Sequence, residues 1–353
     1  MNSSSPTRAR PRGRAAWVGA ALAVALAAAS LWGCGSGPAG GSGGSGGVGS
    51  SATPAQPAAS QAPGPAQTFG PAQTPAPAAT AGQGAGAGAP ARATRVVFVD
   101  VGQGDAEVIR SGSWAGLIDG GPAGSEQAVE AALRKLGVRR LSAVAVSHMH
   151  ADHIGALPRL IGKWRPKVVY AASPLTAALA SACTAAGSRV VRVARGSPPM
   201  RWGAATARVL SPGSLSDDAN EDSMVVLLGA GGARFLFTGD CTGPNEAGVG
   251  AICARGPPVT VLKVAHHGSR YSTSSSFVAD VRPRVAVIDV GPNSYGHPTA
   301  EVLESLRAAG ATLYTTWKNG TITFTVGASG SMKRSFSRSP QPVKGGADAR
   351  AGQ

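Results

Sequence analysis

Short apolar runs alternate along the chain with longer segments in which apolar residues recur every three or four positions. The short runs are rich in Val, Ile, Leu and Phe and end at Gly, Asn or Asp, which is typical of β-strands. They predict strands over residues 94–101, 106–110, 114–119, 141–146, 167–172, 188–194, 205–210, 223–228, 233–239, 259–265, 284–290, 311–316 and 321–326.

The segments between these strands include some with the apolar spacing of amphipathic helices. They cover residues 124–136, 154–162, 174–186, 273–281 and 299–309. Two glycine-containing turns, at 229–232 and 318–320, predict hairpins. Hairpins with interspersed helices favour an α/β (α+β) fold, a sandwich in which two mixed sheets pack together and the helices lie outside.

The beginning of the chain differs in composition from the middle. Residues 1–34 start with a short region containing four arginines and continue in an apolar stretch too short for a comfortable membrane span. They end in Leu31-Trp32-Gly33-Cys34, a pattern that predicts a lipoprotein-type signal peptide with the lipid attached to Cys34. An uncleaved anchor helix is the alternative. Either interpretation places the rest of the chain outside the cytoplasm.

Two further segments contain too little apolar residue volume to form a core. Residues 35–94 consist almost wholly of Gly, Ser, Pro, Ala, Gln and Thr, so burial cannot offset the entropy lost on ordering. We predict a disordered linker there and a disordered tail over 328–353. The foldable part is then one domain of ordinary size, residues 95–327.

Charge and cysteine content constrain the function only weakly. The formal net charge is +15, but residues 95–327 contain 23 Lys and Arg against 17 Asp and Glu, a net of +6. The excess lies between Arg134 and Arg208 and is either a solvated basic face or a track for a polyanion. A disulfide between Cys241 and Cys253 is compatible with a location outside the cytoplasm and would leave Cys183 unpaired.

All six histidines lie in three short stretches of the chain. The first stretch, "SHMHADH", follows a predicted buried strand. Because alternate residues of an extended chain point the same way, His148 and His150 can converge on one metal ion. Asp152 and His153 follow where the chain turns into a helix, which directs them to a second point nearby. The spacing therefore predicts half of a site for two metal ions.

The other polar motifs stand at similar places, at strand ends or directly before a helix. A strand precedes Asp240, whose two carboxylate oxygens can bridge two cations. The next strand ends in His266 and His267, and His297 stands directly before a predicted helix. Each of these residues alone is more typical of a cap or a packing contact, but together they predict one metal centre.

The order HxHxDH followed by Thr-Gly-Asp resembles the signature of the metallo-β-lactamase fold. A wider set of motifs resembles the metallo-β-lactamase domain of the ComEC family of DNA-uptake proteins, in family order across about 96–326. These motifs are "VVFVDVGQGDAEVI", "LIDGG", "SHMHADHIGAL", "DSMVVLL", "FLFTGD", "LKVAHHGS" and "NSYGHP". The sequence departs from that family in two ways. ComEC proteins carry a transmembrane channel of several helices, whereas this sequence contains no second long apolar segment. Residues 244–258 are Gly-rich where the family has a firmer helix.

The resemblance implies a hydrolase with two divalent metal ions, Zn²⁺ or Mn²⁺, and no organic cofactor. It assigns metal ligands to six residues, His148, His150, Asp152, His153, Asp240 and His266. In this assignment His148 and His150 bind the first ion, Asp152 and His153 bind the second, and Asp240 bridges both. His266 is the expected further ligand of the second ion.

The resemblance also implies roles in catalysis for Asp152, His267 and His297. Either histidine could protonate the leaving oxygen, and His297 also competes with His266 as a ligand of the second ion. No histidine stands where the superfamily commonly supplies a third one to the first ion. Water or one residue of the segment Asn220-Glu221-Asp222 is expected there.

Three residues of "FVDVGQGD" are expected near the centre. Asp100 is predicted to support a metal-bound histidine or to be structural, and Gln103 and Asp105 to line the cleft.

The leading functional hypothesis is a phosphodiesterase or nuclease that acts on DNA outside the cytoplasm through a hydroxide activated by two metal ions. The expected partners are DNA or another phosphodiester, the membrane through the N-terminal lipid anchor, and a DNA-uptake channel protein. The expected location is the cell membrane outside the cytoplasm, with partial secretion as an open alternative. Two alternatives remain: a surface hydrolase of a smaller ester (a choline-phosphate or teichoic-acid ester, a lactone or a β-lactam) and a non-catalytic DNA-binding lipoprotein.

Overall fold

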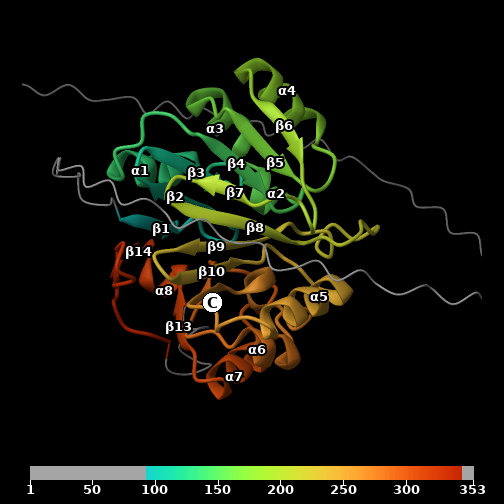
Figure 1. Cartoon of the computed structure of the whole chain (residues 1–353), viewed down its shortest axis with the longest axis vertical. Helices are drawn as coiled ribbons and strands as arrows, with labels where there is room; N and C mark the ends of the chain where they lie inside the picture. Colours follow the sequence, from blue (N-terminus) through green and yellow to red (C-terminus); the bar gives the residue numbers. More distant parts are fainter. Residues whose placement is uncertain (1–92, 344–353) are drawn as a thin grey trace, which may run out of the picture. The chain divides into compact units, whose positions relative to one another are not determined.

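The computed structural model describes residues 93–343, in which two β-sheets lie between two layers of helices (Figure 1). The first sheet has eight strands in the order β15-β14-β1-β2-β3-β4-β5-β6, and the second has seven in the order β13-β12-β11-β10-β9-β8-β7. Both sheets are mixed, with parallel pairs from β3 to β6 in the first and from β10 to β13 in the second. The sandwich of two mixed sheets with helices outside is confirmed.

The strands of the first sheet are β1 (Thr94–Phe98), β2 (Glu107–Ser111), β3 (Trp114–Ile118), β4 (Ala143–Val146), β5 (Val168–Ala171), β6 (Arg189–Arg192), β14 (Ile322–Val326) and β15 (Met332–Phe336). Those of the second are β7 (Met200–Trp202), β8 (Ala205–Ser211), β9 (Val225–Ala230), β10 (Ala233–Phe237), β11 (Val261–Lys263), β12 (Val285–Ile288) and β13 (Thr312–Thr315). The helices are α1 (Glu126–Lys135), α2 (Ala151–Ile154), α3 (Leu157–Trp164), α4 (Ala177–Ala186), α5 (Gly243–Ala254), α6 (Ser275–Val281), α7 (Ala300–Ala308) and α8 (Thr316–Asn319), with a short 3₁₀ turn, η1, over Ala265–Gly268.

The central core lies between the two sheets. Alternate residues of a strand face opposite sides, so Val96 and Phe98 of β1 point into this core while Val97 points towards the outer helices. The Phe98 ring lies 5.9 Å from the ring of Phe237 in the second sheet. Burying one such side chain contributes about 1.5–3 kcal/mol. Helices α1, α3 and α4 cover the outer face of the first sheet, and α5, α6 and α7 that of the second (Figure 1).

Several details differ from the sequence-based expectations. The turn at 229–232 joins β9 and β10 as an antiparallel hairpin, as predicted. The predicted hairpin at 318–320 is wrong: these residues belong to α8 and its end, and they connect β13 of the second sheet to β14 of the first. The Gly-rich segment 244–258 forms most of α5, held by burial of Val249 and Cys253. Strand β7 was not predicted.

The predicted domain boundaries also need correction. Strand β15 lies inside the predicted tail, 328–353, and pairs with β14 along its whole length. Its sequence carries no apolar alternation, so it is held by backbone pairing with β14 and by Met332 and Phe336 at its two ends, which pack against the central core. Strand β1 begins at Thr94, one residue before the predicted domain. The predicted signal peptide with Cys34, the rest of the linker and residues 344–353 lie outside the described residues.

The cysteines in the described part of the chain are free thiols. Cys183, Cys241 and Cys253 are all buried, and the disulfide that the sequence allowed between the last two is not formed. Within residues 93–343, no helix has the length and apolar character needed to cross a membrane.

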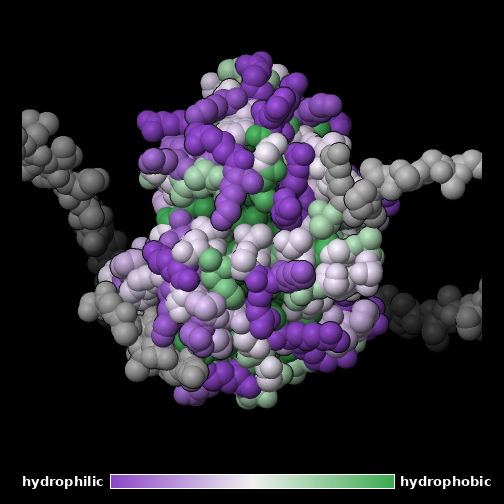
Figure 2. Space-filling model, turned by 90° about the vertical axis from the view of Figure 1, so that its left-hand side faces the viewer, coloured by the Kyte–Doolittle hydropathy of each residue, from purple (hydrophilic) through white to green (hydrophobic). Residues whose placement is uncertain are grey.

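The basic stretch lies at the amino ends of the parallel strands. Arg139 and Arg140 precede β4, and Arg165 and Lys167 precede β5; all four are exposed. The histidine motif follows the carboxyl end of β4, so these basic residues stand at the opposite edge of the sheet. Figure 2 shows how hydrophilic residues cover much of one face of the described part. The position of the basic residues favours a solvated surface over a track leading to the site.

Candidate metal centre

Loops at the carboxyl ends of several strands converge on one place. His148 and His150 follow β4, Asp240 follows β10, and His267 lies in η1 directly after β11. The carboxyl ends of neighbouring parallel strands meet at the same edge of a sheet, which brings the loops after β10, β11 and β12 together. The predicted convergence of distant motifs is therefore what the structure shows.

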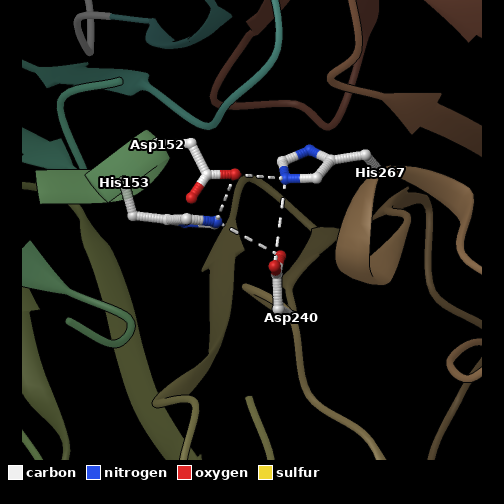
Figure 3. A group of neighbouring side chains, drawn as sticks. All are labelled: Asp152, His153, Asp240 and His267. Carbon is white, nitrogen blue, oxygen red and sulfur yellow. Dashed lines mark hydrogen bonds and ion pairs between the residues drawn. The ribbon is translucent and has the colours of Figure 1, made fainter. Parts of the chain in front are cut away.

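The larger donor group consists of Asp152, His153, Asp240 and His267 (Figure 3). Their ligand-type atoms lie within 4.8 Å of one another and point to a common centre. His267 Nε2 lies 3.0 Å from Asp152 Oδ2 and 3.8 Å from Asp240 Oδ2. His153 Nε2 lies 3.3 Å from Asp240 Oδ1. Two imidazoles and two carboxylates at these distances could hold one divalent ion.

The second donor group consists of His148, His150 and Asp240. His148 Nε2 lies 3.8 Å from Asp240 Oδ2, and the two imidazole rings are 4.6 Å apart. Asn220 lines the same cavity, and its Oδ1 is buried without a hydrogen-bond partner. This amide oxygen is therefore the best placed of the residues expected to replace the third histidine. Asp222 is not, because its Oδ1 accepts a hydrogen bond from the Ser216 backbone.

Buried polar atoms that lack a hydrogen-bond partner show whether the two donor groups are suited to metal ions. His148 Nε2, His153 Nε2 and Asp240 Oδ1 are buried and have no hydrogen-bond partner. Buried polar atoms are normally satisfied, and each orphan costs about 1–3 kcal/mol. Because the three atoms belong to the two donor groups that share Asp240, a pair of cations fits the arrangement.

The backbone at η1 gives the two neighbouring histidines different surroundings. Both His266 and His267 have left-handed φ angles, 51° and 55°, which turn their side chains in different directions. His267 joins the four-residue group and is buried, whereas His266 lies outside it. His266 Nε2 is 3.8 Å from Asp240 Oδ2, and its ring faces that of His297 at 5.6 Å. The structure therefore brings His267, and not His266, into the four-residue donor group, while His266 stays next to Asp240 on the cavity wall.

Hydrogen bonds fix which ring nitrogen each histidine presents to the centre. His267 Nδ1 donates to the backbone oxygen of Asp289 at 2.7 Å, and His153 Nδ1 donates to Asp119 Oδ2 at 2.9 Å. His148 Nδ1 donates to Ser147 Oγ at 3.0 Å. In each case Nδ1 is engaged away from the centre and Nε2 faces it, the orientation typical of histidine ligands. Nearby carboxylates outweigh burial and raise the pKa of His153 and His267, so a cation would displace a proton from their Nε2 atoms on binding.

Asp119 is a functional residue that the sequence analysis missed. It follows β3, is fully buried, and accepts hydrogen bonds from the backbone and the hydroxyl of Ser147 in addition to His153. It thus orients one candidate ligand directly and another, His148, through Ser147. Its signal in the sequence was a carboxylate at the end of a predicted strand, the same design as Asp240.

A buried lysine lies beneath the centre. Lys263 Nζ pairs with Asp105, donates to the Gly239 backbone oxygen at 2.9 Å and lies 3.8 Å from Asp240 Oδ1. Burial would lower the pKa of Lys263, but Asp105 and Asp240 outweigh this effect and raise it. The lysine is therefore a fixed positive charge among carboxylates. Gly239 has a φ of 52°, and a Cβ there would lie 2.7 Å from Ser147 Cβ, so only glycine allows this close approach.

The charges of the metal-free site suit cation binding. Burial alone would raise the pKa of Asp240, but His153 and His267 outweigh burial and lower it well below its ordinary value. Burial and the neighbouring His153 lower the pKa of His148, which is therefore a neutral imidazole. Burial also lowers the pKa of His297, to about 4, and His266 adds to the effect. Ionised carboxylate and neutral imidazole are the forms that ligate metals.

A cavity of about 570 Å³ opens over the two donor groups. Its lining is Gln103, Pro122, Ala123, His150, Ala151, Asp152, Gly155, Asn220, Asp240, His266, His267, Tyr295 and His297. Gln103 lines the cleft as predicted, and Asp105 lies buried below it. Asp100 does not support a ligand: it pairs with Arg338, and its backbone donates to Thr321.

Comparison with known proteins agrees with the site. Residues 99–291 match the family model described as the metallo-beta-lactamase superfamily. The chain is 30% identical over 244 residues to "Competence protein ComA" of Neisseria gonorrhoeae, which covers 68% of this chain and 33% of that protein. It is 29% identical over 255 residues to "ComE operon protein 3" of Bacillus subtilis (strain 168), covering 65% of this chain and 32% of that protein. The chain thus spans about a third of the length of these curated relatives.

Among solved structures, the metallo-beta-lactamase fold protein YhfI from Bacillus subtilis aligns with 68% of this chain and 99% of its own, at 13% identity and a TM-score of 0.46. The family match covers more than half of the chain and includes the histidine motif after β4, Asp240 and His267. The expected resemblance to competence proteins is confirmed by the curated relatives. The chain belongs to the metallo-beta-lactamase superfamily.

Proposed function

We propose that this protein is a metal-dependent phosphodiesterase that hydrolyses DNA outside the cytoplasm. The observation that carries the proposal is the sharing of Asp240 by two donor groups at the floor of an open cavity. Two cations bound there would supply Lewis acids and a water activated for attack on a phosphodiester. The relatives named as competence proteins support DNA as the substrate.

The residues of the chain have separable roles in this proposal. His148, His150 and Asn220 Oδ1 would hold one cation, and Asp152, His153 and His267 the other, with Asp240 between them. His297 is half-buried on the cavity wall and close to His266. Its position suits it to hold the leaving oxygen by a hydrogen bond. His267 Nδ1 is hydrogen-bonded to the backbone oxygen of Asp289, and its Nε2 faces the centre. In this proposal His267 is therefore a ligand and does not transfer a proton to the leaving oxygen.

The imidazole-rich donor set favours Zn²⁺, and its share of carboxylates also admits Mn²⁺. Elemental analysis of the protein as purified identifies the metal, and two equivalents per chain are expected. The test of function is degradation or nicking of plasmid DNA by the metal-loaded protein, lost in the double variant Asp152→Ala/His153→Ala. An active double variant with wild-type metal content contradicts the proposal.

A hydrolase of smaller esters is the second candidate. Two observations favour it: the cavity volume of about 570 Å³ is in the range of small-molecule sites, and the exposed basic stretch lies at the far edge of the sheet from the cavity. A panel of chromogenic phosphodiesters, a lactone and a chromogenic β-lactam compared with DNA separates the candidates. Higher kcat/KM on a small ester than on DNA would replace the first proposal by the second.

We further propose that the protein is lipid-anchored through Cys34 on the outer side of the cell membrane, where it would act with a DNA-uptake channel. The arginine-rich start, the apolar stretch and the terminal Leu-Trp-Gly-Cys of residues 1–34 support the anchor. Metabolic labelling with radioactive palmitate is expected to label the wild type and not Cys34→Ser. Cys34→Ser protein that still incorporates the label contradicts this assignment.

A further inference from the structure

Two tyrosines are conspicuous among the few large exposed hydrophobic side chains of the described residues. Tyr271 is 78% exposed and Tyr295 is 73% exposed. Only Tyr295 lines the cavity over the two donor groups. A single exposed tyrosine is ordinary on a protein surface. Tyr295 differs from Tyr271 in its place, because its exposed ring stands on the wall of the cavity.

A series of ring contacts connects Tyr295 to the candidate metal centre. Its ring is stacked on His297, with 5.7 Å between centroids and an angle of 28° between planes. The His297 ring lies 5.6 Å from that of His266, and His266 Nε2 lies 3.8 Å from Asp240 Oδ2. One face of Tyr295 is therefore held by His297, while most of the side chain remains open to solvent at the mouth of the cavity.

The loop that carries Tyr295 is pre-organised. Asn293 Oδ1 accepts hydrogen bonds from the backbone nitrogens of Tyr295 and His297, both at 3.1 Å. Asn293 Nδ2 donates to the backbone oxygens of Gly291 and His297, both at 2.9 Å. A flat aromatic surface held in place before binding avoids most of the ordering cost that a mobile side chain would add.

A positive charge accompanies this surface. Arg270 is exposed and stands two residues after η1, the turn that carries His266 and His267 of the cavity wall. An open aromatic face together with a nearby cation is the combination that binds single-stranded nucleic acid, with a base on the ring and the backbone phosphate on the cation. A base pair inside a duplex is stacked on both faces and cannot offer one to Tyr295.

We propose that Tyr295 stacks an unpaired base next to the attacked phosphodiester and so selects single-stranded DNA, or frayed ends, over intact duplex. This inference deepens the proposed nuclease function and rests on it for the identity of the reaction. It assigns Tyr295 a role in substrate specificity and none in bond cleavage.

The test measures binding of the full chain in a chelating buffer, so that no strand is cut. Fluorescence anisotropy gives Kd for a labelled single strand, its duplex and an abasic strand of equal length. The expected order of affinity is single strand over duplex and over abasic strand. Tyr295→Leu keeps an apolar cover on His297 but cannot stack, so it weakens single-strand binding by about 5- to 150-fold and leaves abasic binding unchanged.

Two further variants make the result specific. Tyr295→Phe keeps the ring and is expected to bind within about twofold of the wild type, because stacking and not the hydroxyl carries the contact. Tyr271→Leu is the matched control, an equally exposed tyrosine that does not line the cavity, and it is expected to leave all three affinities unchanged.

The inference is overturned if the wild type does not bind a single strand, or if Tyr295→Leu binds it as tightly as the wild type does. It is also overturned if Tyr295→Phe loses as much single-strand affinity as Tyr295→Leu, or if Tyr295→Leu weakens binding of the abasic strand by the same factor as binding of the single strand. The proposed nuclease function fails in a different way. In that case the metal-loaded wild type hydrolyses no DNA, while the preference for unpaired bases and its loss in Tyr295→Leu persist.

Discussion

Replacing Asp119 by asparagine tests the claim that this carboxylate positions the metal ligands. The substituted side chain has nearly the same shape, and its oxygen can still accept the hydrogen bond from the Ser147 backbone, which is 2.8 Å long in the wild type. Its amide nitrogen cannot accept from His153 Nδ1, which is fully buried and has its closest partner, at 2.9 Å, in Asp119. The change therefore removes the acceptor of His153 Nδ1 and of the Ser147 hydroxyl, which lies 2.5 Å from the same carboxylate oxygen, and keeps the acceptor of the Ser147 backbone.

The expected loss of metal affinity and of stability follows from the missing acceptor of His153 Nδ1. Loss of the partner of a metal-bound histidine typically weakens metal affinity or activity by about 10- to 100-fold. A buried donor left without an acceptor also costs about 1–3 kcal/mol of stability. The loss should concentrate on the cation held by His153, while the cation held by His148 and His150 is affected less, through Ser147 alone.

Calorimetric titration of the metal-free protein with Zn²⁺ separates the two binding steps. We expect Asp119→Asn to weaken one step by about 10- to 100-fold and the other by less. Asp100→Asn is the matched control, since Asp100 also precedes a glycine-rich loop but pairs with Arg338 away from the centre. If both steps of Asp119→Asn equal those of the wild type and of Asp100→Asn, the positioning role assigned to Asp119 is wrong.

Three further predictions concern stability and reactivity. Lys263→Met removes the cation from a buried cluster of carboxylates and should lower the free energy of unfolding, measured in urea, by about 3–5 kcal/mol. Lys333 is exposed, so Lys333→Met should change this free energy little. Equal urea unfolding curves for the two variants would contradict the stabilising role of the buried ion pair. In metal-free protein, burial lowers the pKa of His297 from 6.5 to about 4. Between pH 6.5 and about 4 the unfolded chain therefore binds a proton at His297 that the folded protein does not, so the free energy of unfolding falls as the pH drops through this range. His297→Gln should make this decline less steep. A decline equal to that of the wild type would refute the lowered pKa of His297. Burial raises the pKa of Cys241 to about 12 and also raises those of Cys183 and Cys253, so these three thiols should react with Ellman's reagent only after unfolding.

Residues at the ends of apolar runs could be predicted to converge because strand, turn and donor side chain occupy consecutive positions. The structure brings His148, His150, Asp152, His153 and Asp240 together for that reason. The choice between His266 and His267 could not be made from spacing, since it depends on two left-handed backbone angles in η1 that carry no residue-type signal. Adjacent identical residues give the sequence no means of distinguishing the candidate ligand from its neighbour.

The elements that the sequence did not predict are held by contacts between distant parts of the chain. Strand β15 has a polar middle and is held by pairing with β14 and by its two ends, Met332 and Phe336, which pack against the core. Helix α5 contains glycines that disfavour a helix, but Glu246 accepts hydrogen bonds from the backbones of Thr273 and Ser274, which ties the helix to the loop before α6. The local pattern of apolar residues indicates which face of a segment can be buried, but it does not indicate which distant segment packs against it or pairs with it.

The position of β1 between β2 and β14 has a consequence for the biosynthesis of the protein. The first strand of the domain to leave the ribosome acquires its second neighbour only after residues 322–326 are made. His148 follows a strand of the first sheet and His267 a strand of the second, so their donor atoms meet only when the two sheets pack together. A nascent or truncated chain in which the two sheets have not packed would therefore lack the assembled donor groups.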